Sequence, residues 1–199
     1  VRELRRRGAF AARPEPDLKR LLDLVALATV CDVMPLTGLN RAFVAQGLKV
    51  LARRDRAGLA ALLAVTGAKD APSAHTLGYL LGPRINASGR IAESDLGLRL
   101  LLEDDPVEAR AMAETLDSVN KRRQEVEADV LGAALAAAER QAERGHPVLL
   151  VLGEGWHPGV VGIVAGRIKE RFNRPACVAG LSGGLAKGSG RSVPGVDLG

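Results

Sequence analysis

Apolar positions along the chain follow two different patterns, and the change of pattern divides the sequence into two parts. In the first part they recur mostly at helical spacing, as in the segment 18–25, which follows a capping residue, Asp17. After residue 146 they instead form short continuous runs at 148–152 and 175–180. Such runs predict strands that are covered on both faces. We therefore predict a helical first part and a last part that contains a sheet.

The segment 160–172, between the two apolar runs, again has helical spacing. A strand, a helix and a strand joined by short connections form a parallel unit of a small α/β domain. Gly183 and Gly184 predict a tight turn into a third strand over 185–192. Ligands of such units lie at the carboxyl ends of the strands, and His157 falls at this point.

A long helix is predicted to connect the two parts. Asp105 can cap it, Pro106 suits its first position, and Glu108 completes a pattern like a capping box. Helical residues then continue to Arg144, which gives roughly 39 residues and about 58 Å. The apolar seam of this helix is narrow, which indicates a strut between two lobes. The predicted segments are 1–104, a connecting helix over 105–145, and an α/β domain over 146–199.

Composition narrows the class of protein without identifying it. With 199 residues, 47% of them hydrophobic, the chain can bury a core, and its net charge of +5 with clustered arginines permits a polyanionic partner. Cys31 and Cys177 lie far apart in apolar runs, which favours buried thiols in a reducing compartment over a disulfide. One tryptophan and one tyrosine give little indication of base stacking.

Neither a membrane span nor a signal peptide is predicted, because no apolar run approaches about 20 residues and the arginine-rich start lacks an apolar core. We therefore expect a cytoplasmic protein without a membrane partner. Since Val1 is not an initiator, we also expect the chain to be part of a longer protein.

Asp32 is an acid within the apolar phrase 30–36. An ionised carboxylate among apolar neighbours needs a cation, a metal ion or several hydrogen-bond donors. Asp32 is therefore a candidate ligand for a hard divalent ion. A role as the cap of the following turn fits the spacing equally well.

The segment 82–90 places polar side chains at alternate positions. Its initial glycine and proline argue against a continuing helix. We predict an extended strip on which Arg84, Asn86, Ser88 and Arg90 point the same way. Two guanidinium groups and an amide on one edge form a clamp for phosphate oxygens. The alternative is a loop whose arginines pair with nearby acids, namely Glu93, Asp95, Glu103 or Asp104.

The last part of the chain supplies further candidates for phosphate binding. His157 stands near the start of a helix, where it can donate to an anion at the helix N-terminus. Ser189 and Arg191 are two residues apart on the predicted third strand and so share a face, with Lys187 on the same side. Together with Asp32, these residues indicate a phosphodiester site, for which metal-activated water is the natural chemistry.

Four phrases in series carry a family resemblance: DLVALATVCDVMPL at 23–36, GPRINASGR at 82–90, GWHPGVVGIVA at 155–165 and GSGRS at 188–192. In this order and spacing they resemble the RecJ type of single-stranded-DNA-specific exonuclease, within the DHH phosphoesterase superfamily. The resemblance implies an α/β fold class, with the C-terminal part of a DHH domain joined by a long helix to a partial DHHA1 domain.

The resemblance also implies a function and a site. It implies a bacterial, 5′ to 3′ exonuclease for single-stranded DNA in recombination and repair, with Mn²⁺ or Mg²⁺ as cofactor; we also consider a helicase and a single-strand-binding protein as partners. Asp32 matches the family's last metal-binding aspartate and His157 faces the scissile region, so both are candidate catalytic residues. Ser189 and Arg191 match a pair that holds the 5′ phosphate. The implied substrate-binding residues are Arg84, Asn86, Arg90, Gly188, Ser189, Gly190 and Arg191.

The chain lacks three features of the family pattern. The Asp-His-His motif is absent, since no two histidines are adjacent, and so are the glycine-rich histidine motif and the oligonucleotide-binding fold that follow in the family. One carboxylate cannot hold a catalytic ion, so hydrolysis by this chain alone is not expected. Two alternatives stay open: a phosphodiesterase for short oligonucleotides or cyclic dinucleotides, and a non-catalytic nucleic-acid-binding module.

Overall fold

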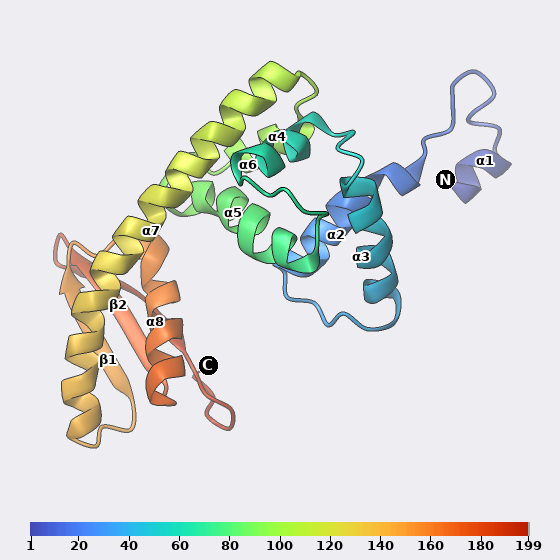
Figure 1. Cartoon of the computed structure of the whole chain (residues 1–199). Helices are drawn as coiled ribbons and strands as arrows, with labels where there is room; N and C mark the ends of the chain where they lie inside the picture. Colours follow the sequence, from blue (N-terminus) through green and yellow to red (C-terminus); the bar gives the residue numbers. More distant parts are fainter. Residues whose placement is uncertain (199) are drawn as a thin grey trace. The chain divides into compact units, whose positions relative to one another are not determined.

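The computed structural model describes residues 1–198, which form two compact units (Figure 1). Unit 1 contains residues 1–83 and 99–114, and unit 2 contains residues 84–98 and those from 115 onward. The long helix α7 (Pro106–Glu143) has residues in both units. The segment boundaries at 105 and 145 stay a prediction. Within residues 1–198, no helix is both long and apolar enough to cross a membrane.

Unit 1 is helical, as predicted. Its core consists of leucines that are at most 1% exposed, on α4, on the π-helical stretch before Gly82, and on α6. These core residues are Leu59, Leu62, Leu63, Leu77, Leu81 and Leu100. The elements are α1 (Arg2–Arg6), the 3₁₀ helix η1 (Leu18–Leu21), α2 (Leu22–Cys31), α3 (Gly38–Leu51), α4 (Ala57–Val65), the π-helix η2 (Thr76–Leu81), and the ends of α6 (Leu96–Leu102) and α7 that belong to this unit.

The face of α2 that turns inward differs from the predicted one. Asp17 does cap the start, since its carboxylate accepts from the Lys19 backbone N–H at 3.0 Å. However, the predicted apolar stripe over 18–25 is largely exposed, and the buried residues are Asp23, Ala26 and Leu27. Asp23 can be buried because the Arg56 guanidinium lies 3.0 Å from its carboxylate.

Both cysteines are free thiols, but each is partly exposed and not fully buried as predicted. The Cys31 thiol lies 3.6 Å from the Leu77 carbonyl oxygen, to which it donates. Burial raises the pKa of the Cys31 thiol, so the thiol stays protonated and poorly nucleophilic at neutral pH.

The predicted extended strip over 82–90 is wrong, because this segment is a helix, α5 (Gly82–Ile91). It continues directly from η2. Proline lacks an N–H and its ring crowds the carbonyl four residues earlier, so a proline inside a helix needs a local change of winding. The π-helical stretch provides this change just before Pro83. On a helix, residues two apart are rotated by about 200°, so the four polar side chains do not share a face.

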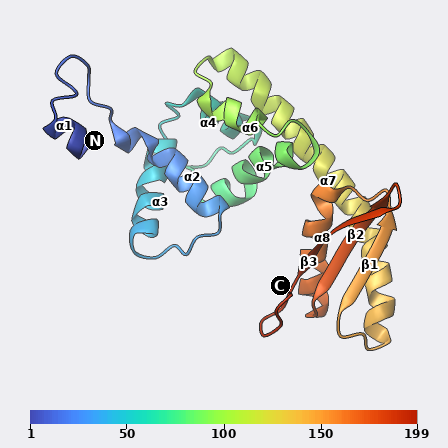
Figure 2. The ribbon, with the colours of Figure 1, turned by 180° about the vertical axis from the view of Figure 1, so that it is seen from behind.

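Unit 2 contains the predicted α/β fold. Strands β1 (Leu149–Glu154) and β2 (Ala176–Ser182) are parallel, and helix α8 (Pro158–Phe172) connects them (Figure 2). Strand β3 (Leu185–Arg191) is antiparallel to β2. The two-residue turn before β3 has φ values of 56° at Gly183 and 75° at Gly184, which only glycine adopts without strain. The predicted order of strands is therefore confirmed.

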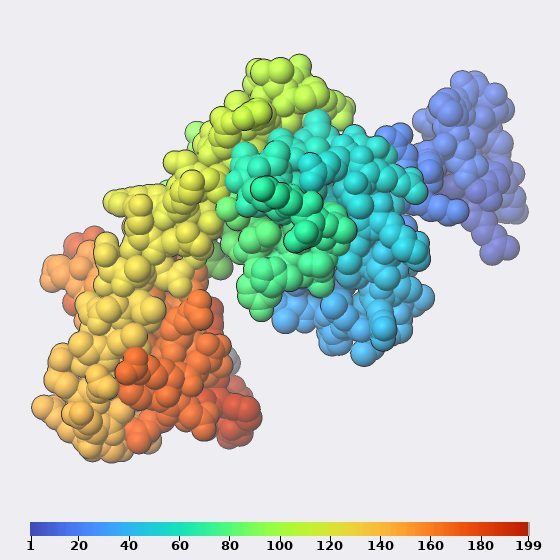
Figure 3. Space-filling model, viewed as in Figure 1, coloured from blue at the N-terminus to red at the C-terminus, as the bar shows by residue number. Residues whose placement is uncertain are grey.

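Helices α7 and α8 cover the same face of this sheet. Their buried residues pack with those of β1 and β2 in one core, and the surfaces of α7 in yellow and α8 in orange lie side by side in Figure 3. Leu150 and Leu152 on the other face of β1 are 56% and 50% exposed. The prediction that β1 is covered on both faces is therefore wrong, because both helices lie on one side.

Helix α7 begins as predicted, and the Asp105 carboxylate accepts from the backbone N–H groups of Val107 at 2.7 Å and Glu108 at 3.2 Å. It ends at Glu143. It is not the exposed strut that its narrow seam indicated, because it contributes buried residues to each unit. These include Ala109, Ala113, Leu116, Asn120, Arg123, Val130, Ala134 and Ala138.

Candidate phosphate-binding site

Ser189 and Arg191 form a pair on one face of β3, the face that also carries Val178 and Ala176 of β2. The Arg191 guanidinium donates to the Ser189 hydroxyl and to the Gly190 carbonyl, each at 2.7 Å. Both acceptors are neutral, and among residues 1–198 no carboxylate lies within 4.0 Å of this guanidinium. Arg191 therefore carries a positive charge that an anion can pair with.

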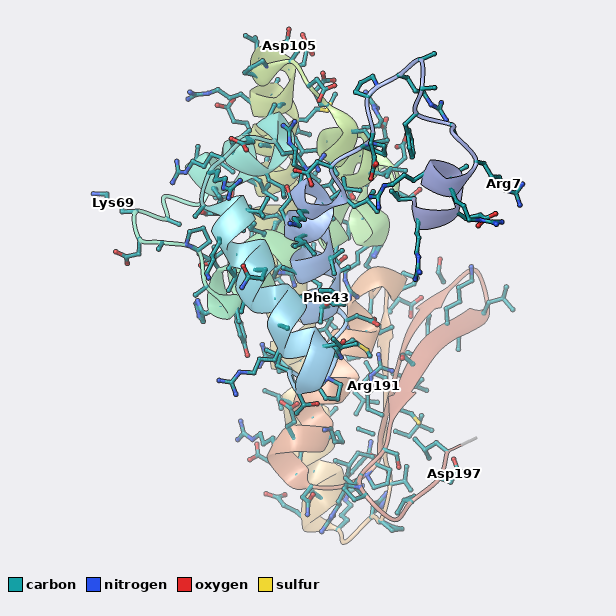
Figure 4. All side chains as sticks on the ribbon, turned by 90° about the vertical axis from the view of Figure 1, so that its right-hand side faces the viewer. Arg7, Phe43, Lys69, Asp105, Arg191 and Asp197 are labelled. Carbon is teal, nitrogen blue, oxygen red and sulfur yellow. The ribbon has the colours of Figure 1, made fainter. Side chains whose placement is uncertain are left out.

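The first half of α8 lies directly against this pair. A Cβ atom at Gly162 would lie 3.1 Å from the Arg191 Nη2 atom and 3.2 Å from the Ser189 hydroxyl oxygen. Figure 4 shows Arg191 between α8 and the strands. Gly162 is the fifth residue of α8, so the pair packs against the second turn of this helix.

His157 is the N-cap of α8, and Pro158 occupies the first helical position, as predicted. The imidazole Nδ1 atom accepts a hydrogen bond from the Gly159 N–H at 3.0 Å. An accepting Nδ1 carries no proton, so the neutral ring has its proton on Nε2. His157 is exposed, and its Nε2–H group is the one that can donate to a ligand.

Arg90 is bound to the same turn. Its guanidinium donates to the Gly159 carbonyl at 3.1 Å, and a Cβ atom at Gly159 would lie 2.3 Å from the Arg90 carbonyl oxygen. The end of α5 therefore packs directly on the start of α8. This contact supports the turn that orients His157.

Arg84 already has a carboxylate partner. Its Nε atom lies 2.8 Å from the Asp117 carboxylate, and the two side chains are 15% and 13% exposed. Lys121 approaches the same carboxylate at 2.8 Å. Burial alone would raise the pKa of Asp117, but hydrogen bonds from Lys121 and Arg84 outweigh it and hold this pKa below its usual range. The ion pair fastens α5 to α7.

The remaining candidate residues, in segments 82–90 and 188–192, differ in their surroundings. Asn86 is exposed on α5, whereas Ser88 is 1% exposed and its hydroxyl donates to the Ile85 carbonyl at 3.0 Å. Gly188 and Gly190 alternate with the pair on β3 and so lie on the opposite face. A Cβ atom at Gly188 would lie 2.6 Å from that of Ala179, so close packing of the two strands requires this glycine.

Asp32 belongs to unit 1, and it is not buried as its apolar neighbours suggested. It is the C-cap of α2, and its neighbour Val33 is 86% exposed. Water therefore solvates the Asp32 carboxylate, and no internal cation is needed. The side chain does not cap the following turn, since only its backbone N–H is bonded, to the Ala28 carbonyl at 2.9 Å.

The turn after Asp32 is unusual because a β-branched residue has a positive φ. Val33 has φ 55°, its N–H bonds to the Val30 carbonyl, and the Met34 N–H bonds to the Thr29 carbonyl. These two bonds define a Schellman motif, in which the left-handed position is usually glycine. Valine at this position is strained, and such strain often occurs at functional sites.

The described part of the chain does not contain a complete metal site. In residues 1–198, no group of three or more histidine, cysteine, aspartate or glutamate side chains is placed to hold a metal ion. One exposed carboxylate at Asp32 does not fit a resident Mn²⁺ or Mg²⁺ ion, which needs several oxygen ligands.

Two residues at the site were missed in the sequence. Asp117 is 33 residues from Arg84, and nothing in the local pattern of α7 indicates their pairing. Gly162 could have been identified more easily than Asp117, because it is a glycine between apolar residues of a predicted helix. A glycine in such a position often marks a close approach to another element.

The fold is that of an α/β protein with a helical unit joined to it, and the Ser189–Arg191 pair is its candidate site for an anion. No family model matches the chain. Among curated proteins, it is 47% identical over 205 residues to the single-stranded-DNA-specific exonuclease RecJ of Dickeya dadantii, covering 98% of this chain and 35% of that protein. It is 44% identical over 205 residues to RecJ of Escherichia coli, again covering 98% and 35%, and 39% identical over 165 residues to RecJ of Thermus thermophilus, covering 83% and 24%.

Solved structures give the same result. The crystal structure of Thermus thermophilus RecJ in complex with Mn²⁺ matches with a TM-score of 0.81 and 35% identity, over 95% of this chain and 27% of that one. A structure of exonuclease RecJ bound to manganese matches with a TM-score of 0.80 and 34% identity, over 96% and 46%. The chain belongs to the RecJ family, and it spans about a third of the length of the curated relatives from Dickeya and Escherichia. The predicted fold class, with its long helix, is confirmed.

Proposed function

We propose that this chain forms the substrate-holding part of a metal-dependent 5′ to 3′ exonuclease for single-stranded DNA. The observation that carries the proposal is the Arg191 guanidinium, which within residues 1–198 has neutral partners and lies beside Ser189 at the first half of α8. This arrangement suits the phosphate group at the end of a strand. The names of the relatives supply the class of substrate.

The residues have different roles in this proposal. Ser189 and Arg191 contact the terminal phosphate, and His157 donates through Nε2 to the strand. Arg90 is a substrate-binding residue that also supports the turn of His157. We propose that Asn86, Gly188 and Gly190 also lie on the substrate side, and that Arg84 does so while it stays paired with Asp117.

Mn²⁺ or Mg²⁺ is the proposed cofactor of the whole protein, because the matching RecJ structures are complexes with these ions. Asp32 is proposed to supply one ligand. Since residues 1–198 contain no group of three or more side chains placed to hold a metal ion, we propose that the chain does not hydrolyse DNA by itself. The roles in recombination and repair, and the helicase and single-strand-binding protein as partners, are part of the same proposal.

The test uses a protein of the relatives' length that contains this chain. With Mn²⁺ it should shorten 5′-phosphorylated single strands from the 5′ end, and Asp32→Ala should abolish cleavage while DNA binding is retained. Asp70→Ala, which changes another exposed aspartate of unit 1, is the control and should cleave normally. Unchanged turnover in Asp32→Ala would remove Asp32 from the site.

The second candidate function is binding of nucleic acid without catalysis, and the solitary exposed Asp32 favours it. In that case a protein of the relatives' length that contains this chain binds single strands but does not cleave them with either ion. A phosphodiesterase of short substrates is distinguished by its preference for dinucleotides over long strands.

A further inference from the structure

A cavity of about 330 Å³ opens at the carboxyl ends of β1 and β2, beside the N-terminus of α8. It is lined by the loop after β1 and by the β2–β3 hairpin, including Trp156, His157, Gly180, Ser182, Leu185 and Lys187. Its volume lies at the lower end of the range of about 300–1,000 Å³ that is typical of small-ligand sites. Of these residues, only His157 belongs to the site described above.

Two glycines allow Trp156 to form a wall of this cavity. Gly153 and Gly180 are partners in the register of β1 and β2. A Cβ atom at Gly153 would lie 2.0 Å from the indole ring, and one at Gly180 would lie 2.0 Å from the Trp156 carbonyl oxygen. Trp156 therefore lies flat against the sheet, packed on the core of unit 2 and still partly exposed. A rigidly held, partly exposed indole is suited to stacking on a nucleobase.

Lys187 extends the line of donors along β3. It pairs with Gly180, whereas Ser189 pairs with Val178 and Arg191 with Ala176, so the three donors lie on one face. Successive positions on that face are about 6.7 Å apart, which is on the order of the separation of neighbouring phosphates in an extended single strand. Within residues 1–198, no carboxylate lies within 4.0 Å of the Lys187 ammonium group.

We propose that this cavity is a subsite for one nucleotide of a single strand, with the base stacked on Trp156 and a neighbouring phosphate paired with Lys187. The subsite rests on the proposed function, because Ser189 and Arg191 hold the terminal phosphate. The subsite adds a contact with a base. A strand with bases should therefore bind more tightly than a sugar-phosphate chain of the same charge.

Trp156 is the only tryptophan of the chain, so its fluorescence reports on the cavity directly. The chain is titrated with 5′-phosphorylated oligothymidylate and with an abasic strand of equal length, while the anisotropy of a 3′ label measures binding. Oligothymidylate should bind about 5- to 150-fold more tightly and quench the tryptophan, as one stacked base predicts. Binding without any change in fluorescence overturns the subsite and leaves the proposed function intact. If neither strand binds, both proposals fail.

Two variants separate the base contact from the phosphate contact. Trp156→Leu keeps an apolar side chain over the glycines and should lose the preference for oligothymidylate over the abasic strand. Lys187→Ala should reduce the slope of log affinity against log salt concentration by about 0.7, the value for one phosphate contact with a single strand. Lys69→Ala, an exposed lysine of unit 1 that Figure 4 labels, is the matched control and should leave the slope unchanged. An unchanged slope in Lys187→Ala overturns the phosphate contact.

Discussion

Arg84 and Arg191 stand in similar glycine-containing phrases, but their surroundings differ. The Arg84 guanidinium is 2.8 Å from the Asp117 carboxylate, and both side chains are mostly buried. The Arg191 guanidinium has a hydroxyl and a carbonyl as acceptors and is exposed. Among the described residues, the Arg84 charge has a carboxylate partner and the Arg191 charge has neutral acceptors.

This difference shows that glycine next to arginine is not in itself the mark of a phosphate site. The glycine and proline before Arg84 are part of helix α5, and Arg84 links α5 to α7 through Asp117. At Arg191 the glycines alternate along a strand at the edge of the sheet, which leaves the arginine facing α8 and solvent. The role of each arginine therefore depends more on the group that pairs with its charge than on the sequence around it.

The largest expected effect is on DNA binding by the Arg191→Ala variant. Loss of a charged hydrogen bond of about 1.5–3 kcal/mol should weaken binding of a 5′-phosphorylated single strand about 10- to 150-fold. The free energy of unfolding should change by less than about 0.5 kcal/mol, since the side chain is exposed. Fluorescence anisotropy and urea denaturation measure the two effects. Equal losses of binding in Arg84→Ala and Arg191→Ala, with stability unchanged in both, would remove the contrast.

The next effect is on stability in the Asp117→Asn variant. At pH 7 this change should lower the free energy of unfolding by about 1–3 kcal/mol, because a mostly buried guanidinium loses its carboxylate. The pKa of Asp117 is lowered in the folded protein, so the stabilisation is present above the ordinary carboxyl pKa and is lost as the pH falls through the folded value. The difference between the two proteins should therefore shrink below about pH 4. A difference that does not depend on pH would contradict the ion pair as its source.

A matched pair of glycine variants on α8 sharpens the contrast further. A Cβ atom at Gly162 would press on Arg191 and Ser189, whereas one at Gly166 would meet nothing within 4 Å. In both variants the higher helix propensity of alanine should stabilise α8 by up to about 1 kcal/mol. Gly162→Ala should nevertheless weaken strand binding several-fold, and Gly166→Ala should not. Equal binding by the two variants would mean that the approach of α8 does not shape the site.

The smallest expected effect concerns Val33, beside Asp32. Val33→Gly removes the strain of a left-handed β-branched residue and should raise the free energy of unfolding by about 1 kcal/mol. Little packing is lost, since Val33 is 86% exposed. Thermal and urea denaturation measure the gain. A loss of stability would show that the valine side chain makes up for its strain through contacts.

The sequence by itself determined the elements whose causes are local. The Asp105 cap with Pro106 and the glycine turn before β3 depend on neighbouring residues, and both were predicted. The order strand, helix, strand was also predicted, because it follows from the apolar pattern along the chain, although the pairing of β1 with β2 joins distant residues. The alternation of Ser189 and Arg191 on one strand face is of the same kind, since it follows from the period of two.

Only the tertiary structure decided which groups meet. The Asp117 partner of Arg84 and the exposure of one face of β1 both depend on residues or packing distant in sequence. Local propensity sets what a segment can form, but burial and charge pairing depend on which surfaces come into contact. These contacts decide that Arg84 is satisfied internally and that Arg191 is left with neutral acceptors.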